Sequence, residues 1–388
     1  MRIENLSRFI VFSVIGSVAL MPLLVLPAMI GVLVDQANLS ESMAGWSASL
    51  NFIGAAAIGL LMSLRIHHLN LRQVGTLALA LAFLADLAAA FTAGPTITFL
   101  VVRTIGGVVL GAAYIAAASS FARYDGYERG FGVFVTLQFI ISGMGLYIVP
   151  VFSAELGARG LFFAFAALDL VALTLARYLP DEVAAGERND KSKSELHVLF
   201  TLAAILAIAG FALFEAANNV QFTYIERFGV SLNISEHQIG MSLLVASLAG
   251  IPGAFTIVVI GHRFGTIRPL TLGIAISISG MLILLSSKTY LWYFIGGCFM
   301  GFSWAYCLPY IQSLLASLDR KGSAIAAGTS FSTLGSALGP GAAALVVTGG
   351  KYGNVFMLSI ALFVITFVCF VYAARHRKAE QFWETNDH

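Results

Sequence analysis

Twelve long apolar runs divide the chain, and they restrict it to folds that can cross a lipid bilayer. Each run can span roughly 30 Å of hydrocarbon at about 1.5 Å per helical residue. Because no water reaches that layer, each segment must pair its own backbone groups, which favours helices. The alternating pattern of β-barrel strands does not occur in the runs. The runs cover 7–35, 42–64, 72–93, 96–120, 129–152, 158–178, 198–225, 237–261, 267–287, 290–317, 322–348 and 351–375.

The composition supports an integral membrane protein. Of the 388 residues, 59% are hydrophobic and 11% are charged, whereas soluble domains carry about 25% charged residues. The net charge of +2 suggests no nucleic-acid partner. Cys298, Cys307 and Cys369 all lie in apolar runs, and neither they nor the scattered histidines have metal-ligand or disulfide spacing. We expect no cofactor and no metal.

Lysine and arginine are distributed unevenly between the two sides that the runs define. With the amino terminus inside, 17 of them lie on the inner side and 4 on the outer side, and Arg103 completes the 22. This bias predicts that both termini are cytoplasmic in a multi-pass protein of a bacterial inner membrane. The first run shows no convincing cleavage site, so we expect a retained helix rather than a signal peptide.

A polar stretch at residues 179–197 separates the first six runs from the last six. Pro180 ends the sixth run, and the residues after it have the composition of a solvated linker. The predicted fold is therefore an all-α membrane protein, with twelve transmembrane helices in two pseudo-symmetric six-helix bundles. The bundles are residues 1–178 and 198–388, and the second ends in a short cytoplasmic tail.

Arg103 lies inside the fourth run, and Gly107 and Gly111 follow it at helical spacing. A charge at that depth costs at least about 2.5 kcal/mol, so it suggests a function, although it could also only brace helices. The two glycines form a smooth strip on which another helix can pack closely. The motif Arg103-x3-Gly107-x3-Gly111 resembles the fourth-helix motif of proton-coupled members of the major facilitator superfamily. The two six-helix halves are similar to that family's layout, and the chain resembles its sugar-efflux and drug-efflux branch.

The loops after the second and eighth runs partly resemble the family's signature loop, Gly-x-x-x-Asp-Arg-x-Gly-Arg. The first keeps Arg65 and Arg72, and the second keeps Arg263 and Gly265, but neither has the acidic residue. In the family this loop stabilises the outward-facing state through charge pairing. The resemblance therefore implies a gating role for these four residues, through a weaker or differently built latch. The alternative is that the arginines only anchor helix ends.

The family's helix 5 antiporter motif is poorly matched here, with only Gly143, Gly145 and Pro150 in place. A better cluster of glycine and proline occupies residues 335–341 in the eleventh run. It predicts either a bend or close packing of that helix.

Three aspartates lie in or beside the runs of the first half. Asp35 ends the first run, where many proton-coupled relatives place an acid that works with the fourth-helix arginine; it could also be a solvated helix end. Asp86 lies at the depth of Arg103 on the neighbouring helix, so a pair between them would serve coupling or simple charge neutralisation. Asp169 lies in the middle of the sixth run, and we expect it to have a structural or cavity-lining role, distant from the helix of Asp86.

Glu215 is the sharpest acidic signal. It shares one helical face with Asn218, Asn219 and Phe222. Polar side chains inside a membrane helix are costly unless they line a wet cavity. Because the seventh helix lines the cavity in the family, the resemblance implies proton coupling by Glu215 and substrate binding by its three neighbours. An inter-helix polar clamp is the alternative.

Aromatic residues with a polar tip mark the tenth run, where Pro309 interrupts the backbone ladder. Interrupted helices in transporters cluster at binding sites. We therefore expect substrate contacts from this run, with weaker candidates elsewhere. The expected substrate-binding residues are Trp304, Tyr306, Tyr310 and Gln312, with Tyr114, Gln138, Ser330 and Ser332 as the weaker ones.

These features predict a secondary active transporter that works by alternating access and is coupled to protons, with Arg103, Asp35, Glu215 and Asp86 as coupling residues. No nucleotide-binding loop occurs, so ATP is not the expected energy source. Glu215 adds negative charge, whereas Arg103 is the only deep cation, which favours efflux of a small neutral or cationic amphipathic molecule. The alternative is proton-coupled uptake of a small monocarboxylate that pairs with Arg103.

An intramembrane enzyme would need a Ser/His pair or paired aspartates at matched depth, and the sequence predicts neither. We therefore expect no catalytic activity. The expected partners are a small-molecule substrate, protons and the lipid bilayer, and we expect a monomer.

The charge bias predicts where the central linker lies. A single cysteine placed within residues 182–194 should react with an impermeant thiol reagent only from the cytoplasmic side. A cysteine at Lys288, on the predicted outer side, is the control and should react in intact cells. Labelling of the linker in intact cells would exclude the predicted topology.

Overall fold

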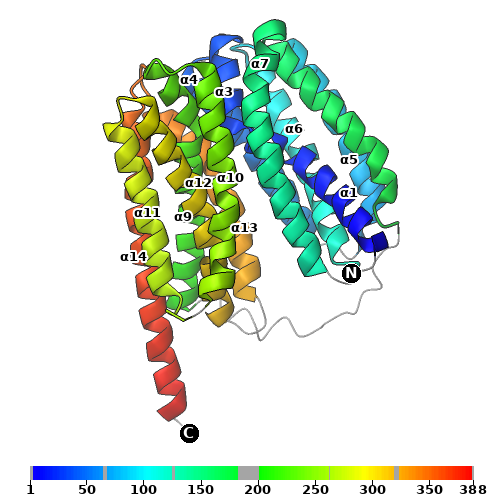
Figure 1. Ribbon diagram of the computed structural model, residues 1–388. Helices are drawn as coiled ribbons and strands as arrows, with labels where there is room; N and C mark the ends of the chain where they lie inside the picture. Colours follow the sequence, from blue (N-terminus) through cyan, green and yellow to red (C-terminus); the bar gives the residue numbers. More distant parts are fainter. Residues whose placement is uncertain are drawn as a thin grey trace.

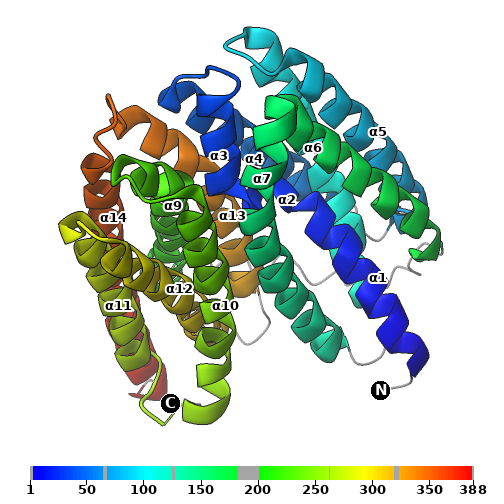
Figure 2. The ribbon, with the colours of Figure 1, turned by 45° about the horizontal axis from the view of Figure 1, so that its top comes forward.

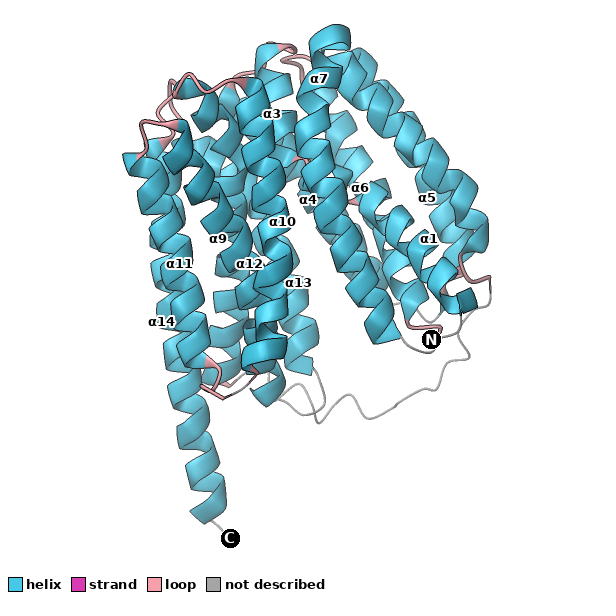
Figure 3. Cartoon of the chain, in the orientation of Figure 1, coloured by secondary structure: helices cyan, strands magenta, loops and turns pink. Residues whose placement is uncertain are grey.

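The computed structural model is all-helical over the residues that it describes, which are 3–63, 68–124, 127–181, 201–261, 263–318 and 323–386 (Figure 3). Ten helical segments in this part of the chain are long and apolar enough to cross a membrane. The predicted all-α membrane protein is therefore confirmed. Residues 182–197 of the predicted linker lie outside the described residues.

The helices from residue 3 to residue 178 form one group, in which α4 and α5 pack against α6, and α1 and α5 pack against α7. In both views α1, α5, α6 and α7 lie on one side of the molecule, and α3 and α4 lie in the middle, next to the other group (Figures 1 and 2). The elements are α1 (Ile3–Ala19), α2 (Met21–Leu24), α3 (Leu26–Asp35), α4 (Glu41–Ser63), α5 (Leu71–Thr92), α6 (Ile97–Phe121), α7 (Tyr127–Leu175) and the 3₁₀ turn η2 (Ala176–Tyr178).

The helices after residue 201 form the other group. Helix α9 packs against both α13 and α14, and α12 packs against α10 and α11. The elements are α9 (Leu202–Ser231), α10 (Glu236–Ile260), α11 (Ile267–Ser286), α12 (Tyr290–Leu318), α13 (Ser323–Val346) and α14 (Gly353–Asn386).

The two groups meet through α4 with α13, α7 with α10, and α3 with α9. Both termini lie at the same end of the molecule (Figure 1). We call the opposite end the distal end; its loops are residues 36–40, 93–96, 232–235, 287–289 and 347–352. The ribbons of the two groups approach each other there and diverge towards the termini.

Three expected helices differ from the prediction. The run 7–35 is broken into α1, α2 and α3, because Pro22 and Pro27 each stand in the first turn of a new helix and lack an N–H donor. The runs 129–152 and 158–178 both lie in α7, where Gly157 interrupts the helix with φ +67°. Pro309 lies inside α12, where it removes one bond of the backbone ladder without ending the helix.

The glycine strip after Arg103 forms a close contact between α6 and α4. A Cβ atom at Gly107 would lie 1.8 Å from the backbone oxygen of Asn51, and one at Gly111 would lie 2.6 Å from the Cα of Ala55. The Asn51 amide also donates a hydrogen bond to the Arg103 carbonyl, at 2.8 Å. The predicted close approach of another helix is confirmed, and its partner is α4.

This contact predicts the effect of one methyl group. Gly107→Ala should lower the free energy of unfolding by about 1–3 kcal/mol, because the backbone of α4 cannot move aside without repacking. Gly132→Ala is the matched control, since a Cβ there meets no described atom within 4 Å. Thermal unfolding of both purified variants is the measurement, and equal melting temperatures would contradict the expectation.

Candidate functional site

Arg103 is enclosed in the group of helices before residue 178. Its side chain is 1% exposed, and Nη1 lies 3.6 Å from Oδ1 of Asp86. Nη2 donates to the sulfur of Met29 at 3.6 Å, and the guanidinium lies 5.3 Å from the centre of the Phe162 ring. The structure thus places the expected Asp86–Arg103 pair in contact, with an aromatic face beneath the cation.

Asp169 joins this pair, contrary to the expectation that its helix is distant from that of Asp86. Helices α5 and α7 pack together, and the two buried carboxyl groups lie close enough to interact, although Oδ2 of Asp169 has no hydrogen-bond partner. Two ionised carboxylates beside a single guanidinium would repel each other in this buried site, which favours a proton on one of them. The cluster of Asp86, Arg103 and Asp169, which we call the buried triad, therefore balances one guanidinium against one carboxylate.

Asp35 pairs with Arg227 rather than with Arg103. It is the last residue of α3, and its Oδ2 accepts a hydrogen bond of 2.5 Å from Nη1 of Arg227 on α9. Two further contacts join the groups nearby: Tyr224 donates to the Glu41 carbonyl at 2.6 Å, and Tyr352 donates to the Glu41 carboxylate. Burial raises the pKa of Tyr352, and the carboxylate that accepts its hydrogen bond raises it further, so this hydroxyl stays a donor at neutral pH.

Glu215 lies where α9, α12 and α13 meet. Its side chain is nearly enclosed, with the residue 7% exposed. The indole N–H of Trp304 donates to Oε1 at 3.2 Å, and the hydroxyl of Ser336 donates to Oε2 at 3.2 Å. Two neutral donors and no cation therefore hold this carboxyl group, among the residues that the structure describes.

The other polar side chains of this predicted face of α9 form hydrogen bonds within the helix. Asn218 and Asn219 each donate to the backbone carbonyl four residues earlier, at 2.8 and 3.0 Å. Gln221 donates to the Asn218 side chain at 3.2 Å. Phe222 is half-buried against the apolar cluster at the distal side. These donors are therefore engaged, whereas Glu215 reaches two other helices.

Trp304 links the two groups of helices. Its ring meets that of Phe139 on α7 edge to face, with ring centres 6.0 Å apart. Sequence reasoning missed Phe139 and Ser336 as neighbours of this site. The signal for Ser336 was its place in the glycine-rich stretch 335–341, which packs α13 on α9, since a Cβ at Gly339 would lie 2.6 Å from that of Asn219.

The other aromatic candidates of α12 lie elsewhere. Tyr306 and Tyr310 are buried in an apolar cluster, with ring centres 5.3 Å apart, and Tyr306 faces Gly273 of α11. Gln312 is exposed. The structure does not bring these three to Glu215.

The weaker candidates are also dispersed. Tyr114 and Gln138 are half-buried, and the Tyr114 ring lies 6.2 Å from that of Phe134. The hydroxyls of Ser330 and Ser332 donate to backbone carbonyls of their own helix.

The expected gating residues show one contact of note. Arg72, in the first turn of α5, lies 2.9 Å from Asp181 and donates to the Leu179 carbonyl at 3.0 Å. The loop after the second run lacks the acidic residue of the family's signature, and Asp181, at the end of the first half, provides a carboxylate for Arg72 instead. Arg263 is exposed and Gly265 has φ +73° in a turn, whereas Arg65 lies outside the described residues.

Comparison with known proteins identifies a single family. The family model described as Major Facilitator Superfamily matches residues 9–318 and 206–387. No curated protein sequence matches the chain.

Solved structures share the fold. A point mutant of the nucleoside transporter NupG has a TM-score of 0.78 at 13% identity, covering 94% of this chain and 99% of its own. The POT family transporter PepTSo has a TM-score of 0.73 at 13% identity, with 97% and 98% covered. NupG itself has a TM-score of 0.69 at 16% identity, with 96% and 99% covered.

The buried triad predicts unequal effects of neutralising its carboxyl groups. Asp169→Asn keeps the Asp86–Arg103 charge pair and supplies an N–H donor, so it should cost about 1 kcal/mol or less. Asp86→Asn combined with Asp169→Asn leaves the guanidinium buried without a counter-charge and should cost about 3–5 kcal/mol. Thermal unfolding at neutral pH distinguishes them. A double variant as stable as the single variant would exclude a charge-balanced triad.

Proposed function

From the premise that this chain belongs to the Major Facilitator Superfamily, we propose that it is a twelve-helix secondary transporter working by alternating access. The family and the fold identify a transporter rather than an enzyme. Residues 1–178 and 198–388 are the two bundles that rock against each other, joined by the linker 179–197. Both termini face the cytoplasm of a bacterial cell, and the distal end faces outwards.

The contacts between the bundles support a state that is closed to the outside. The pairs Asp35–Arg227 and Glu41–Tyr352 both lie at the distal ends of their helices. The Arg72–Asp181 pair, in contrast, lies within the first bundle, at the end nearer the termini. Opening the distal end therefore requires breaking the Asp35–Arg227 ion pair and the hydrogen bond from Tyr352 to Glu41. Both contacts stabilise the state that is closed to the outside.

Glu215 is the observation that carries the substrate proposal. It is a carboxyl group held by an indole N–H and a hydroxyl, with the aromatic ring of Phe139 from the other bundle against Trp304. A negative group beside aromatic faces suits neutral or cationic amphipathic molecules. Arg103 is enclosed and already faces Asp86, which weighs against the alternative, uptake of a monocarboxylate paired with it.

Proton coupling follows from the same carboxyl group. A carboxylate that binds either a proton or a cationic substrate, but not both, exchanges one for the other across the membrane. Inward proton flow then drives efflux, which is the direction we propose. The buried triad supplies a second titrating group in the first bundle, and Asp35 acts in the distal contact with Arg227.

Glu215→Gln tests this proposal. The amide keeps the shape and the hydrogen bonds but does not titrate, so binding or flux should lose its dependence on pH. Trp304→Phe is the control, because it removes one donor and leaves the carboxyl group titratable. A ligand found by thermal stabilisation of the purified protein serves as the probe. A pH profile in Glu215→Gln that matches the wild type would assign Glu215 a structural role.

A further inference from the structure

A small cavity near the distal end has an acidic lining, of which only Asp35 takes part in the proposed function. Its volume is about 50 Å³, enough for at least one water molecule, and it lies between α3, α7, α9 and α10. Three carboxyl groups line it: Asp35, Glu226 and Glu236. Sequence reasoning did not single out Glu226.

Glu226 is the enclosed member of the three. It is 8% exposed, and its Oε2 atom has no hydrogen-bond partner. The carboxyl group lies against the bare Cα of Gly31 on α3, where an ideal Cβ would come within 2.5 Å of Oε2. The contact between α3 and α9 is thus what encloses this group.

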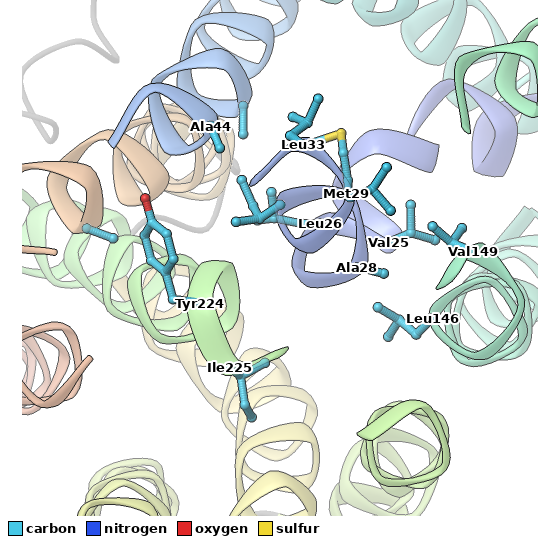
Figure 4. Close-up of a cluster of buried hydrophobic side chains, with 14 of the residues drawn as sticks. Val25, Leu26, Ala28, Met29, Leu33, Ala44, Leu146, Val149, Tyr224 and Ile225 are labelled. Carbon is cyan, nitrogen blue, oxygen red and sulfur yellow. The ribbon is translucent and has the colours of Figure 1, made fainter. Parts of the chain in front are cut away.

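Each helix that packs around Glu226 contributes side chains near its carboxyl group. Helix α3 contributes Asp35 and α10 contributes Glu236, both exposed, and Arg227 on α9 is engaged with Asp35. Helix α12 contributes Tyr293, whose hydroxyl donates to the Ile225 carbonyl at 3.1 Å. Helix α7 contributes apolar groups, with Leu146 beside Ala28 of α3 (Figure 4). An ionised Glu226 would therefore face two other carboxylates with one shared cation.

We propose that Glu226 binds a proton when α3 and α9 close the distal end, and releases it when they separate. An unpaired carboxylate in an enclosed site is strongly disfavoured, whereas its protonated form is neutral and can donate. Separation of the helices would hydrate the group and let it ionise. In the described part of the chain, no group of three acidic, histidine or cysteine side chains is placed to hold a metal ion.

The proposal sets the sign of a pH effect on the gate. Opening releases one proton, so the ratio of open to closed molecules rises with pH, by at most about tenfold per pH unit. Acid outside the cell holds the distal end closed. This inference rests on the proposed alternating access, but its test needs no substrate.

The test uses a thiol reporter inside the cavity. Ala28 is 2% exposed and lines the cavity, so Ala28→Cys, with the three native cysteines replaced by alanine, reports opening. The probe is an impermeant maleimide applied to purified protein in lipid nanodiscs at several pH values. Each rate is divided by that of the unfolded protein at the same pH, because the thiolate fraction also rises with pH.

The reporter rate should rise with pH in the otherwise native protein and lose that slope in Glu226→Gln. Glu236→Gln, which neutralises an exposed carboxyl group of the same cavity, should keep the slope, as should Glu226→Asp. The proposal is overturned if the labelling rate still rises with pH in Glu226→Gln, or if it does not change with pH in the otherwise native protein. A rate that follows sodium instead of pH also overturns it. An unchanged transport profile in Glu215→Gln would refute the proposed coupling site and leave this gate result standing.

Discussion

One buried cation determines how the first half of this transporter is arranged. Arg103 is a charge in a layer where an unpaired ion costs several kcal/mol, so a counter-charge must be placed beside it. Asp86 on α5 meets that need, and the buried carboxyl group of Asp169 on α7 lies beside it. The packing of α5, α6 and α7 is therefore fixed by electrostatics as well as by shape, since separating any of the three helices exposes the pair to lipid.

Close backbone contact provides the second constraint, and both halves use it in the same way. In the first half, Gly107 of α6 admits the backbone of α4, and in the second, Gly335 of α13 admits that of α9, where a Cβ would lie 2.0 Å from the Ala212 oxygen. Without a hydrophobic driving force between helices in lipid, such contacts supply the packing energy. They also bring Ser336, one residue beyond Gly335, within reach of Glu215.

The sequence predicts the helices well and the side-chain partners less well, for a physical reason. Hydrophobic length is a local property, so α4, α5, α6 and α11 lie within a residue or two of their predicted bounds. Partners depend on the rotation of each helix about its axis, which the weakly amphipathic runs do not reveal. Hence Arg103 and Asp86 could be paired from depth and adjacency, whereas Asp169 with Asp86, Arg227 with Asp35, and Ser336 with Glu215 could not. For the same reason the sequence could not predict that Tyr306 and Tyr310 lie in an apolar cluster.

The break between α1 and α3 lets the two parts of the first predicted helix pack against different halves of the molecule. Helix α1 packs on α6 and α7, whereas α3 packs on α9, and the two prolines between them remove two links of the hydrogen-bond ladder. A straight 29-residue rod would have to slide its whole length to release α9. In the proposed opening movement, a jointed helix can swing its outer third while the inner part stays in place, so only the ten residues of α3 have to leave α9.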